Sequence, residues 1–146
     1  MKLFTIGFTK KTAKEFFNLL IENKIKTIID IRRNNKSQLA GFTKENDLKF
    51  FLKKIANIKY VYLSEFAPDE IILKDYRSKN LNWVQFEEKY LDQLKKYENW
   101  ENFDSDILQD GCLLCSESSP SKCHRRLLAE FLLNKYRDKS IQIIHL

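Results

Sequence analysis

The chain has 146 residues, 43% of them hydrophobic, with only 3 glycines and 2 prolines. This composition predicts a single domain over residues 1–146 with a substantial core, and it excludes a low-complexity or linker-rich chain. The net charge of +6 favours anionic partners such as nucleotides or nucleic acid. No apolar run is long enough to cross a bilayer, and the N-terminal run is too short for a signal peptide. We therefore expect no membrane association and a cytoplasmic location.

The first half of the chain alternates between strand-like and helix-like patterns. A short apolar run predicts a first strand at residues 3–8, and a capping box at residues 12–15 predicts the start of an amphipathic helix. The β-branched run at 25–33 predicts a second strand that is buried on both faces. Thr43 is expected to cap the next helix, and a third strand is predicted at 58–63.

Residues 64–82 have the least regular pattern, and we expect them to form a lid or an excursion over the sheet. A second capping box, at residues 82–85, predicts the start of a longer helix. Trp83 and Trp100 bracket this helix. We expect both rings to pack in the core or at the helix edge rather than to stack on bases.

The last third of the chain predicts a strand, a helix and a final strand. The fourth strand is expected at 111–115, and Ser119 is expected to cap a helix whose first turn contains Pro120. The fifth strand is expected at 140–146. Strands that alternate with helices of about a dozen residues are typical of βαβ units. The predicted fold is one three-layer α/β domain, with a doubly wound, mostly parallel sheet of about five strands and helices on both faces.

Polar and ionisable residues follow four of the predicted strands. In an open α/β sheet, ligands bind outside the carboxyl ends of the strands, so these residues are expected to converge on one rim. The residues expected to do proton-transfer or covalent chemistry there are Cys115, Glu117, His124 and Asp30, and those expected to bind an anion are Gly7, Thr9, Arg32, Ser118, Ser119 and Arg125.

The stretch LLCSESSPSKCHRR, residues 113–126, contains most of these candidates. A loop of small residues that leads into a helix presents free amides and the positive end of the helix dipole, which favours a phosphate or a carboxylate. The Cys-x5-Arg cradle of some phosphatases is excluded, because Ser121 occupies the position of its arginine. Cys115 is either a nucleophile activated by His124 or the helix dipole, or a small apolar residue that completes a buried strand.

The other candidates also have a structural interpretation beside the functional one. Asp30 ends a buried strand and needs a partner, so it either forms a rim salt bridge with Arg32 or Arg125 or orients a substrate. Glu117 is either an acid or base, or a solvated loop carboxylate. His124 is an acid or base, a donor to a bound anion, or a cap of the neighbouring loop.

The three cysteines are expected to be thiols, because the chain shows no export signal. Cys112 and Cys115 fall on opposite faces of a strand, so their spacing does not indicate a redox or zinc motif. Cys123 continues the apolar stripe of its helix and is expected to pack in the core. Adjacent Cys123 and His124 point about 100° apart on a helix, which does not favour a metal site. The sequence indicates no particular cofactor.

Four blocks together resemble the DUF488 family of uncharacterised bacterial and archaeal proteins: TIGF, DIRR, SQLAGFTKENDL and LLCSESSPSKCHRRLLAEFL. The family often has a His-Ser pair where this chain has Phe8 and Thr9, and many members have Leu-Gly-Gly where it has residues 65–67. The positions of this chain that match the family's motif residues are Thr5, Gly7, Asp30, Arg32, Ser37, Phe42, Cys115, Glu117, Pro120, Cys123, His124 and Arg125.

Three functional hypotheses follow from these patterns. The first is an enzyme that acts on an anionic small molecule, a nucleotide or a nucleic-acid component, at the carboxyl rim of the sheet. The second is a non-catalytic nucleic-acid-binding or adaptor module that uses the net charge of +6. The third is a thiol redox or metal-linked sensor. The resemblance adds no reaction, and neither it nor the residues indicate an oligomeric state.

Overall fold

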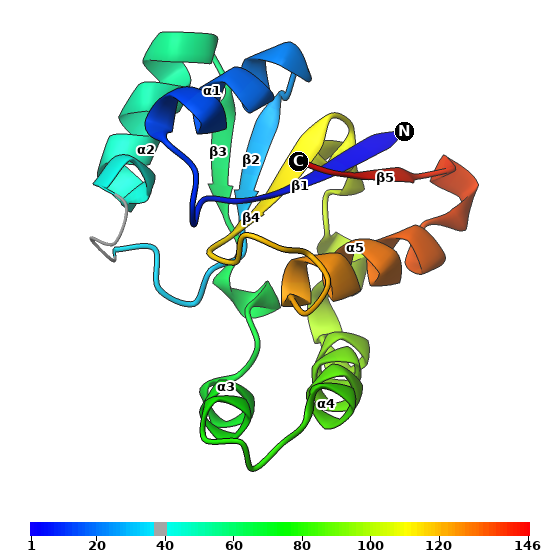
Figure 1. Ribbon diagram of the computed structural model, residues 1–146. Coiled ribbons are helices and arrows are strands. Elements are labelled where there is room, and N and C mark those ends of the chain that lie inside the picture. The colour runs from blue at the N-terminus through cyan, green and yellow to red at the C-terminus, as the bar shows by residue number, and fades with distance from the viewer. Residues whose placement is uncertain (37–40) are drawn as a thin grey trace.

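The computed structural model describes residues 1–36 and 41–146. Its centre is a sheet of five strands in the order β3-β2-β4-β1-β5, and every neighbouring pair is parallel (Figure 1). Each strand overlaps one of the five predicted strands, and all four residues of β2 are buried as expected. The strands are β1 (Lys2–Gly7), β2 (Thr27–Asp30), β3 (Lys59–Tyr62), β4 (Gly111–Cys115) and β5 (Gln142–His145).

Helices cover both faces of the sheet, which confirms the doubly wound three-layer fold. Helices α1 (Ala13–Glu22) and α2 (Glu45–Phe51) pack on one face, and α4 (Trp83–Lys96) and α5 (His124–Lys135) pack on the other. Because side chains alternate along a strand, β4 contributes to a core on each face of the sheet. Cys112 and Leu114 pack in the core with α1 and α2, while Leu113 packs in the core with α4 and α5.

The two predicted capping boxes are present. Thr12 accepts from the amide of Glu15, whose carboxylate accepts from the amide of Thr12, and Asn82 and Gln85 make the same reciprocal pair. These caps are local, so four residues of sequence are sufficient to predict them. Short 3-10 turns lie at Gly41–Thr43, Ser64–Phe66, Glu98–Asn102, Ser105–Leu108 and Arg137–Lys139, and a π-helical turn lies at Leu52–Ala56.

The predicted caps of α2 and α5 are wrong. Helix α2 follows Lys44, because Thr43 ends the preceding 3-10 turn and its carbonyl accepts from Arg32. Helix α5 is capped by Cys123, whose sulfur accepts from an amide of the first turn. Ser119 is instead engaged in its own turn, where its hydroxyl contacts that of Ser121 at 2.9 Å.

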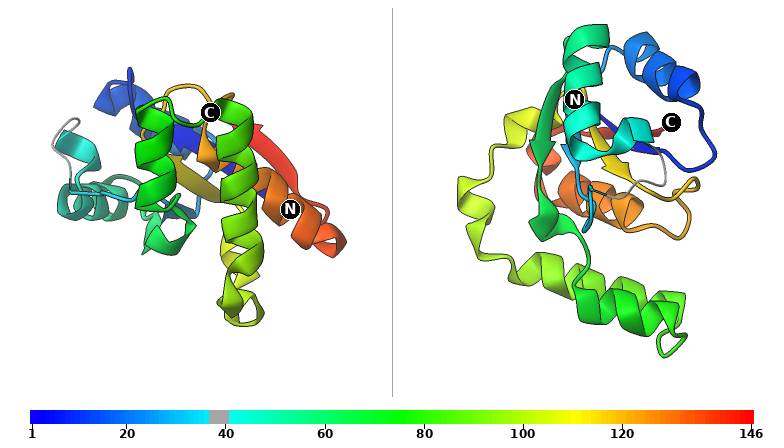
Figure 2. Two further views of the ribbon diagram at one scale, coloured as in Figure 1. Left: turned by 90° about the horizontal axis from the view of Figure 1, so that it is seen from below. Right: turned by 90° about the vertical axis from the view of Figure 1, so that its left-hand side faces the viewer.

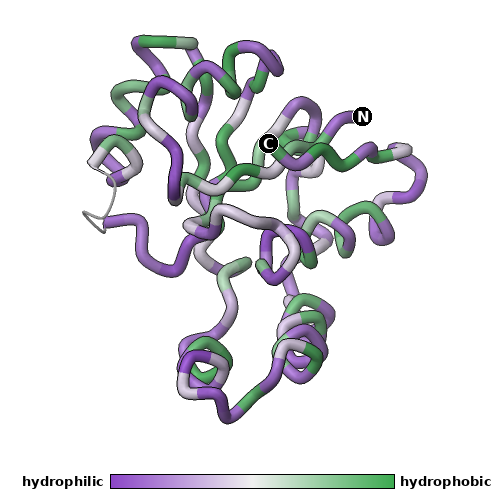
Figure 3. Tube along the Cα trace, viewed as in Figure 1, coloured by the Kyte–Doolittle hydropathy of each residue, from purple (hydrophilic) through white to green (hydrophobic). Residues whose placement is uncertain are grey.

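The segment predicted to be irregular contains helix α3 (Glu70–Arg77). Helices α3 and α4 lie side by side beyond the carboxyl edge of the sheet (Figures 1 and 2). Hydrophobic residues alternate with hydrophilic ones along both helices (Figure 3), and the rings of Tyr76 and Phe86 pack between them. The expected packing of the tryptophans is confirmed, since Trp83 stacks on Phe86 and Trp100 on Phe66.

Among the residues that the structure describes, no helix has both the length and the apolar character needed to span a bilayer.

Candidate functional site

The loops after β2 and β4 diverge at the carboxyl edge of the sheet. The chain after β2 leads to α2 on one face, whereas the chain after β4 leads to α5 on the other face. Because β2 and β4 are neighbours, this divergence creates a topological switch point between them. It is the place at which an open α/β sheet most often forms a binding crevice. The two polypeptide segments that carry most of the candidate residues meet there.

Cys115, Cys123 and Arg125 form a buried cluster behind this edge. Cys115 ends β4 and is 1% exposed, and Cys123 caps α5 and is 3% exposed. Their Sγ atoms are 3.1 Å apart, and both side chains are free thiols. Nη1 of Arg125 donates to Sγ of Cys115 at 3.0 Å. Cys123 is buried as expected, and Cys115 completes a buried strand, as its structural interpretation expected. The contact between the two sulfurs was not predicted.

Arg125 is fully buried, yet no Asp or Glu in the described parts of the chain forms an ion pair with it. A guanidinium stays charged in proteins, and a buried charge needs an opposite charge or dense hydrogen bonding. Besides Cys115, its neighbours are the hydroxyl of Thr5, the carbonyls of Glu117 and Ser118, and the more distant sulfur of Cys123. The two sulfurs are the groups among them that can become anions, and that of Cys115 is the nearer, at 3.0 Å against 4.0 Å.

The surroundings of Cys115 favour its thiolate. Burial by itself raises the pKa of this thiol, but the hydrogen bond from Cys123 and the Arg125 guanidinium outweigh burial and lower the pKa below its ordinary value. The hydrogen bond to Cys115 raises the pKa of Cys123, as does burial. Of the two sulfurs, Cys115 is therefore the one that loses its proton more readily, beside the guanidinium of Arg125 and with Cys123 as a donor to its thiolate.

The loop after β4 passes closely over the end of β1. A Cβ atom on Gly7 would lie 1.6 Å from the carbonyl oxygen of Glu117, so only glycine allows this approach. The backbone amide of Thr9 donates to the carbonyl of Ser116 at 3.1 Å. Gly7 and Thr9 thus hold the loop through their backbone. The carbonyl of Ser118 accepts from Arg125, and neither Ser118 nor Ser119 lines the cleft described below.

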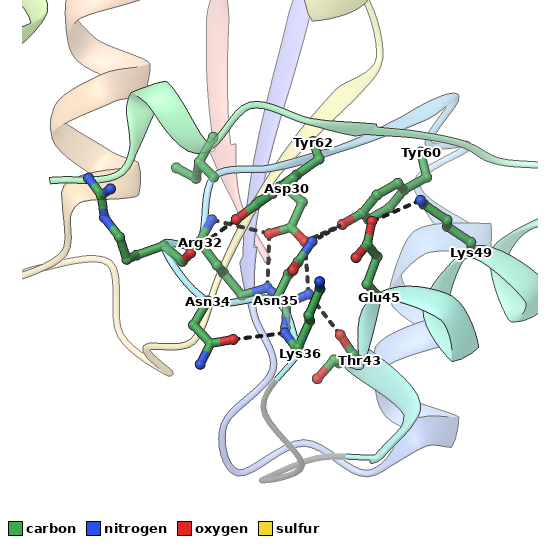
Figure 4. Close-up of polar contacts among 12 residues, drawn as sticks. Asp30, Arg32, Asn34, Asn35, Lys36, Thr43, Glu45, Lys49, Tyr60 and Tyr62 are labelled. Atoms are coloured by element: carbon green, nitrogen blue, oxygen red, sulfur yellow. Dashed lines mark hydrogen bonds and ion pairs between the residues drawn. The ribbon is translucent and has the colours of Figure 1, made fainter. Parts of the chain in front are cut away.

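Asp30 and Arg32 form a second buried network (Figure 4). Both oxygens of Asp30 accept from the Arg32 side chain at 2.8 Å, and Oδ2 also accepts from the hydroxyl of Tyr60 at 2.5 Å. Arg32 donates further to the carbonyl of Thr43. Burial and the Asp30 carboxylate raise the pKa of Tyr60, which keeps its hydroxyl a donor. Asp30 therefore holds Arg32 in place at the end of β2, as the salt-bridge interpretation expected.

A cleft of about 800 Å³ lies between the switch point and helix α3. Arg33 fixes the far wall, because its guanidinium donates to the carbonyls of Ala67 and Pro68 just before α3. The charged side chains that line the cleft are the cations Arg32, Arg33, Lys74 and Arg77 and the carboxylates Glu70 and Glu117.

His124 lines the cleft from the first turn of α5. Burial, with a smaller contribution from Arg125, lowers the pKa of His124 to about 4, so its ring is neutral at pH 7. Nε2 lies 3.2 Å from the carbonyl oxygen of Ile31, which can only accept. Nε2 therefore carries the proton, and Nδ1 is left as an acceptor.

A family model described as "Domain of unknown function DUF488" matches residues 12–132 of the 146-residue chain. The chain belongs to the DUF488 family. This confirms the resemblance seen in the sequence, and the match includes the whole segment from Cys115 to Arg125. No curated protein and no solved structure matched the chain.

Several positions singled out in the DUF488 blocks have structural roles. Phe8, which stands where the family often has histidine, is buried, and the guanidinium carbon of Arg32 lies 5.5 Å from its ring centroid. Phe42 packs on Phe16 and Phe17. Ser37 lies outside the described residues.

The structure adds residues of this DUF488 chain that sequence reasoning missed. The hydroxyl of Tyr60 donates to the carboxylate of Asp30. Nδ1 of His145 lies 2.7 Å from the hydroxyl of Thr5, which also accepts from Arg125. Lys74 and Arg77 are three positions apart, a helical spacing that signals a basic face only if α3 is recognised as a helix. Among the described residues, no cluster of three or more His, Cys, Asp or Glu is placed to hold a metal ion.

Proposed function

We propose that the protein binds a phosphate-bearing ligand, a nucleotide or a nucleic-acid component, in the cleft between the switch point and α3. The observation that carries this proposal is the charge of the cleft, where the cations Arg33, Lys74 and Arg77 face the carboxylates Glu70 and Glu117, apart from Arg32, whose charge Asp30 balances. A guanidinium recognises phosphate through paired, charge-assisted hydrogen bonds. The net charge of +6 adds a long-range attraction for such ligands.

The size and walls of the cleft favour a nucleotide over inorganic phosphate. Its volume of about 800 Å³ lies in the range of pockets that enclose small organic ligands. Leu73 and Pro68 supply apolar surface on the α3 side, which suits a planar base. In this arrangement Lys74 and Arg77 bind the phosphates from α3, and the half-exposed Arg33 adds its charge from the segment after β2. The buried Arg32, which Asp30 balances, forms part of the wall.

Two further side chains are suited to move protons if the bound ligand reacts. Glu117 lies on an exposed part of the loop and lines the cleft, and Nδ1 of His124 is a free acceptor in a neutral ring. We assign no reaction to them. Asp30 serves this site by positioning Arg32, and Gly7, Thr9 and Ser118 serve it by holding the loop that carries Glu117.

The proposal predicts that Lys74→Gln/Arg77→Gln weakens nucleotide binding by at least about tenfold, because each charge-assisted hydrogen bond contributes about 1.5–3 kcal/mol. Isothermal titration calorimetry with ATP, GTP, CTP and UTP measures the affinity, and binding should weaken as salt is added. The matched control is Lys53→Gln/Lys54→Gln, which removes the same charge from exposed residues at the opposite edge of the sheet.

The proposal is wrong if none of the four nucleotides binds, or if the two double variants bind equally well. A short single-stranded oligonucleotide tests the non-catalytic alternative in the same series. If the oligonucleotide binds and both double variants weaken its binding equally, lysines spread over the surface carry the interaction, as the adaptor hypothesis expects. Product analysis of each nucleotide, repeated with Glu117→Gln, distinguishes an enzyme from a binding module.

A further inference from the structure

The buried pair of cysteines is separate from the cleft, because neither Cys115 nor Cys123 lines the cleft. The two sulfurs come from elements that meet only in the folded chain, the end of β4 and the cap of α5. They are 3.1 Å apart, so closure of a disulfide requires an approach of about 1 Å, to an S–S length of about 2.05 Å. We propose that Cys115 and Cys123 form a redox-active pair that a hydroperoxide converts to a reversible disulfide.

Cys115 is the member of the pair that reacts first. Nη1 of Arg125 lies 3.0 Å from its sulfur and supplies a positive charge that the thiolate balances. The sulfur of Cys123 accepts from the backbone amide of Arg125, which fixes its position 3.1 Å from Cys115. Its hydrogen bond to Cys115 and its burial raise the pKa of Cys123, so it keeps its proton and is in position to resolve the oxidised sulfur of its partner.

The reaction has two steps. In the first, the Cys115 thiolate attacks one oxygen of the hydroperoxide, the O–O bond breaks, and the other oxygen leaves as an alcohol or water after it takes a proton from solvent. Cys115 becomes a sulfenic acid, and the hydroperoxide gains the two electrons. In the second step, the sulfur of Cys123 attacks this sulfenic acid, an S–S bond forms, and water leaves with the hydroxyl of the sulfenic acid and the proton of Cys123.

The surroundings also determine how stable the disulfide is. Oxidation removes the one anion beside Arg125 and leaves its guanidinium buried among neutral groups. A dithiol whose reduced form is stabilised in this way has an easily reduced disulfide. A small thiol such as glutathione should therefore return the pair to the reduced state.

The burial of Cys115 limits the size of the oxidant that can reach its sulfur. Cys115 is 1% exposed, so bulky thiol reagents should label it slowly in the folded protein, and we expect the much smaller hydrogen peroxide to react with it faster. Cys112 is an internal reference, because it is equally buried but packs in the core of α1 and α2, away from Arg125. Burial raises its pKa, so it should resist peroxide.

The test is to treat the reduced full-length protein with hydrogen peroxide and to map its cysteines by mass spectrometry without reduction. We expect an intramolecular Cys115–Cys123 disulfide, a Cys112 that stays a thiol, and complete reversal by glutathione. In Cys123→Ser, dimedone should trap a sulfenic acid on Cys115, while Cys112→Ser should behave as the wild type. Arg125→Lys, which keeps the charge but loses the paired contacts, should oxidise more slowly than the wild type.

Three results would overturn the proposal. One is a folded protein in which Cys115 and Cys123 remain thiols at a peroxide dose that oxidises the urea-unfolded chain. Another is oxidation of Cys115 to the sulfinic acid with no disulfide. The third is oxidation of Cys112 as fast as Cys115. None of these results bears on nucleotide binding, so the two proposals can fail independently.

Discussion

Replacement of Arg125 by methionine should lower the free energy of unfolding by about 3 kcal/mol. Methionine fills much of the volume but removes every donor, so the carbonyls of Glu117 and Ser118 lose the hydrogen bonds from Arg125, and the hydroxyl of Thr5 keeps only its contact with His145. The effect lies at the low end of the range for a broken buried ion pair, because Cys115 can take up a proton when the guanidinium is absent. Urea unfolding followed by circular dichroism measures it.

The matched control is Arg126→Met, one position along the same helix. Arg126 pairs with Glu130 across one turn of α5, near the surface. Such pairs contribute well under about 1 kcal/mol. Equal losses in the two variants would contradict the role that we assign to Arg125.

The second large effect is expected for Asp30→Asn, which should cost about 3–5 kcal/mol of unfolding free energy. Asp30 is fully buried and balances Arg32, which is itself only 3% exposed. Asparagine keeps the shape of the side chain but leaves the guanidinium without its counter-charge. Arg32 cannot lose its proton to relieve this, which is why the loss should exceed that of Arg125→Met.

Asp92→Asn serves as the control for Asp30→Asn, because Asp92 pairs with Lys96 on the exposed side of α4. It should unfold at the same urea concentration as the wild type. If Asp30→Asn is as stable as the wild type, Asp30 does not anchor Arg32, and its role as an acid or base on a substrate becomes the better explanation.

The parts of the fold that sequence reasoning predicted have local causes. β-Branched and apolar runs predicted the five strands, and four-residue capping boxes at Thr12 and Asn82 predicted two helices. The convergence of candidate residues at one rim also followed from the topology, because parallel strands all end at the same edge of a sheet whatever their side chains are. Arg32, Glu117 and His124 meet at the cleft for that reason.

The parts that were missed depend on contacts between distant residues. The start of α5 at His124 cannot be deduced from Pro120, because the loop before it is placed by Arg125 and by Gly7, and Gly7 lies more than a hundred residues away along the chain. The same loop path brings Cys123 onto Cys115. Helix α3 was missed because it is only 8 residues long and no side chain caps its start, so it lacks the capping box that marks α1 and α4.

The cleft and the sulfur pair share one loop. Glu117 lines the cleft with its side chain, while its carbonyl accepts from Arg125. The guanidinium thus connects the thiolate to the segment that forms one wall of the proposed binding site. This explains in physical terms why one short stretch, residues 113–126, contains candidates for both sites.

The most direct test of this account is a pH titration of the thiolate absorbance of the reduced protein, with Cys115→Ser as the reference. The difference between the two proteins isolates Cys115. We predict that its thiolate persists below pH 9.0, the ordinary pKa of a cysteine thiol, and that Arg125→Met shifts the titration upward. A Cys115 that titrates at or above 9.0 in the wild type would contradict the buried ion pair and, with it, the assignment of Cys115 as the reactive sulfur.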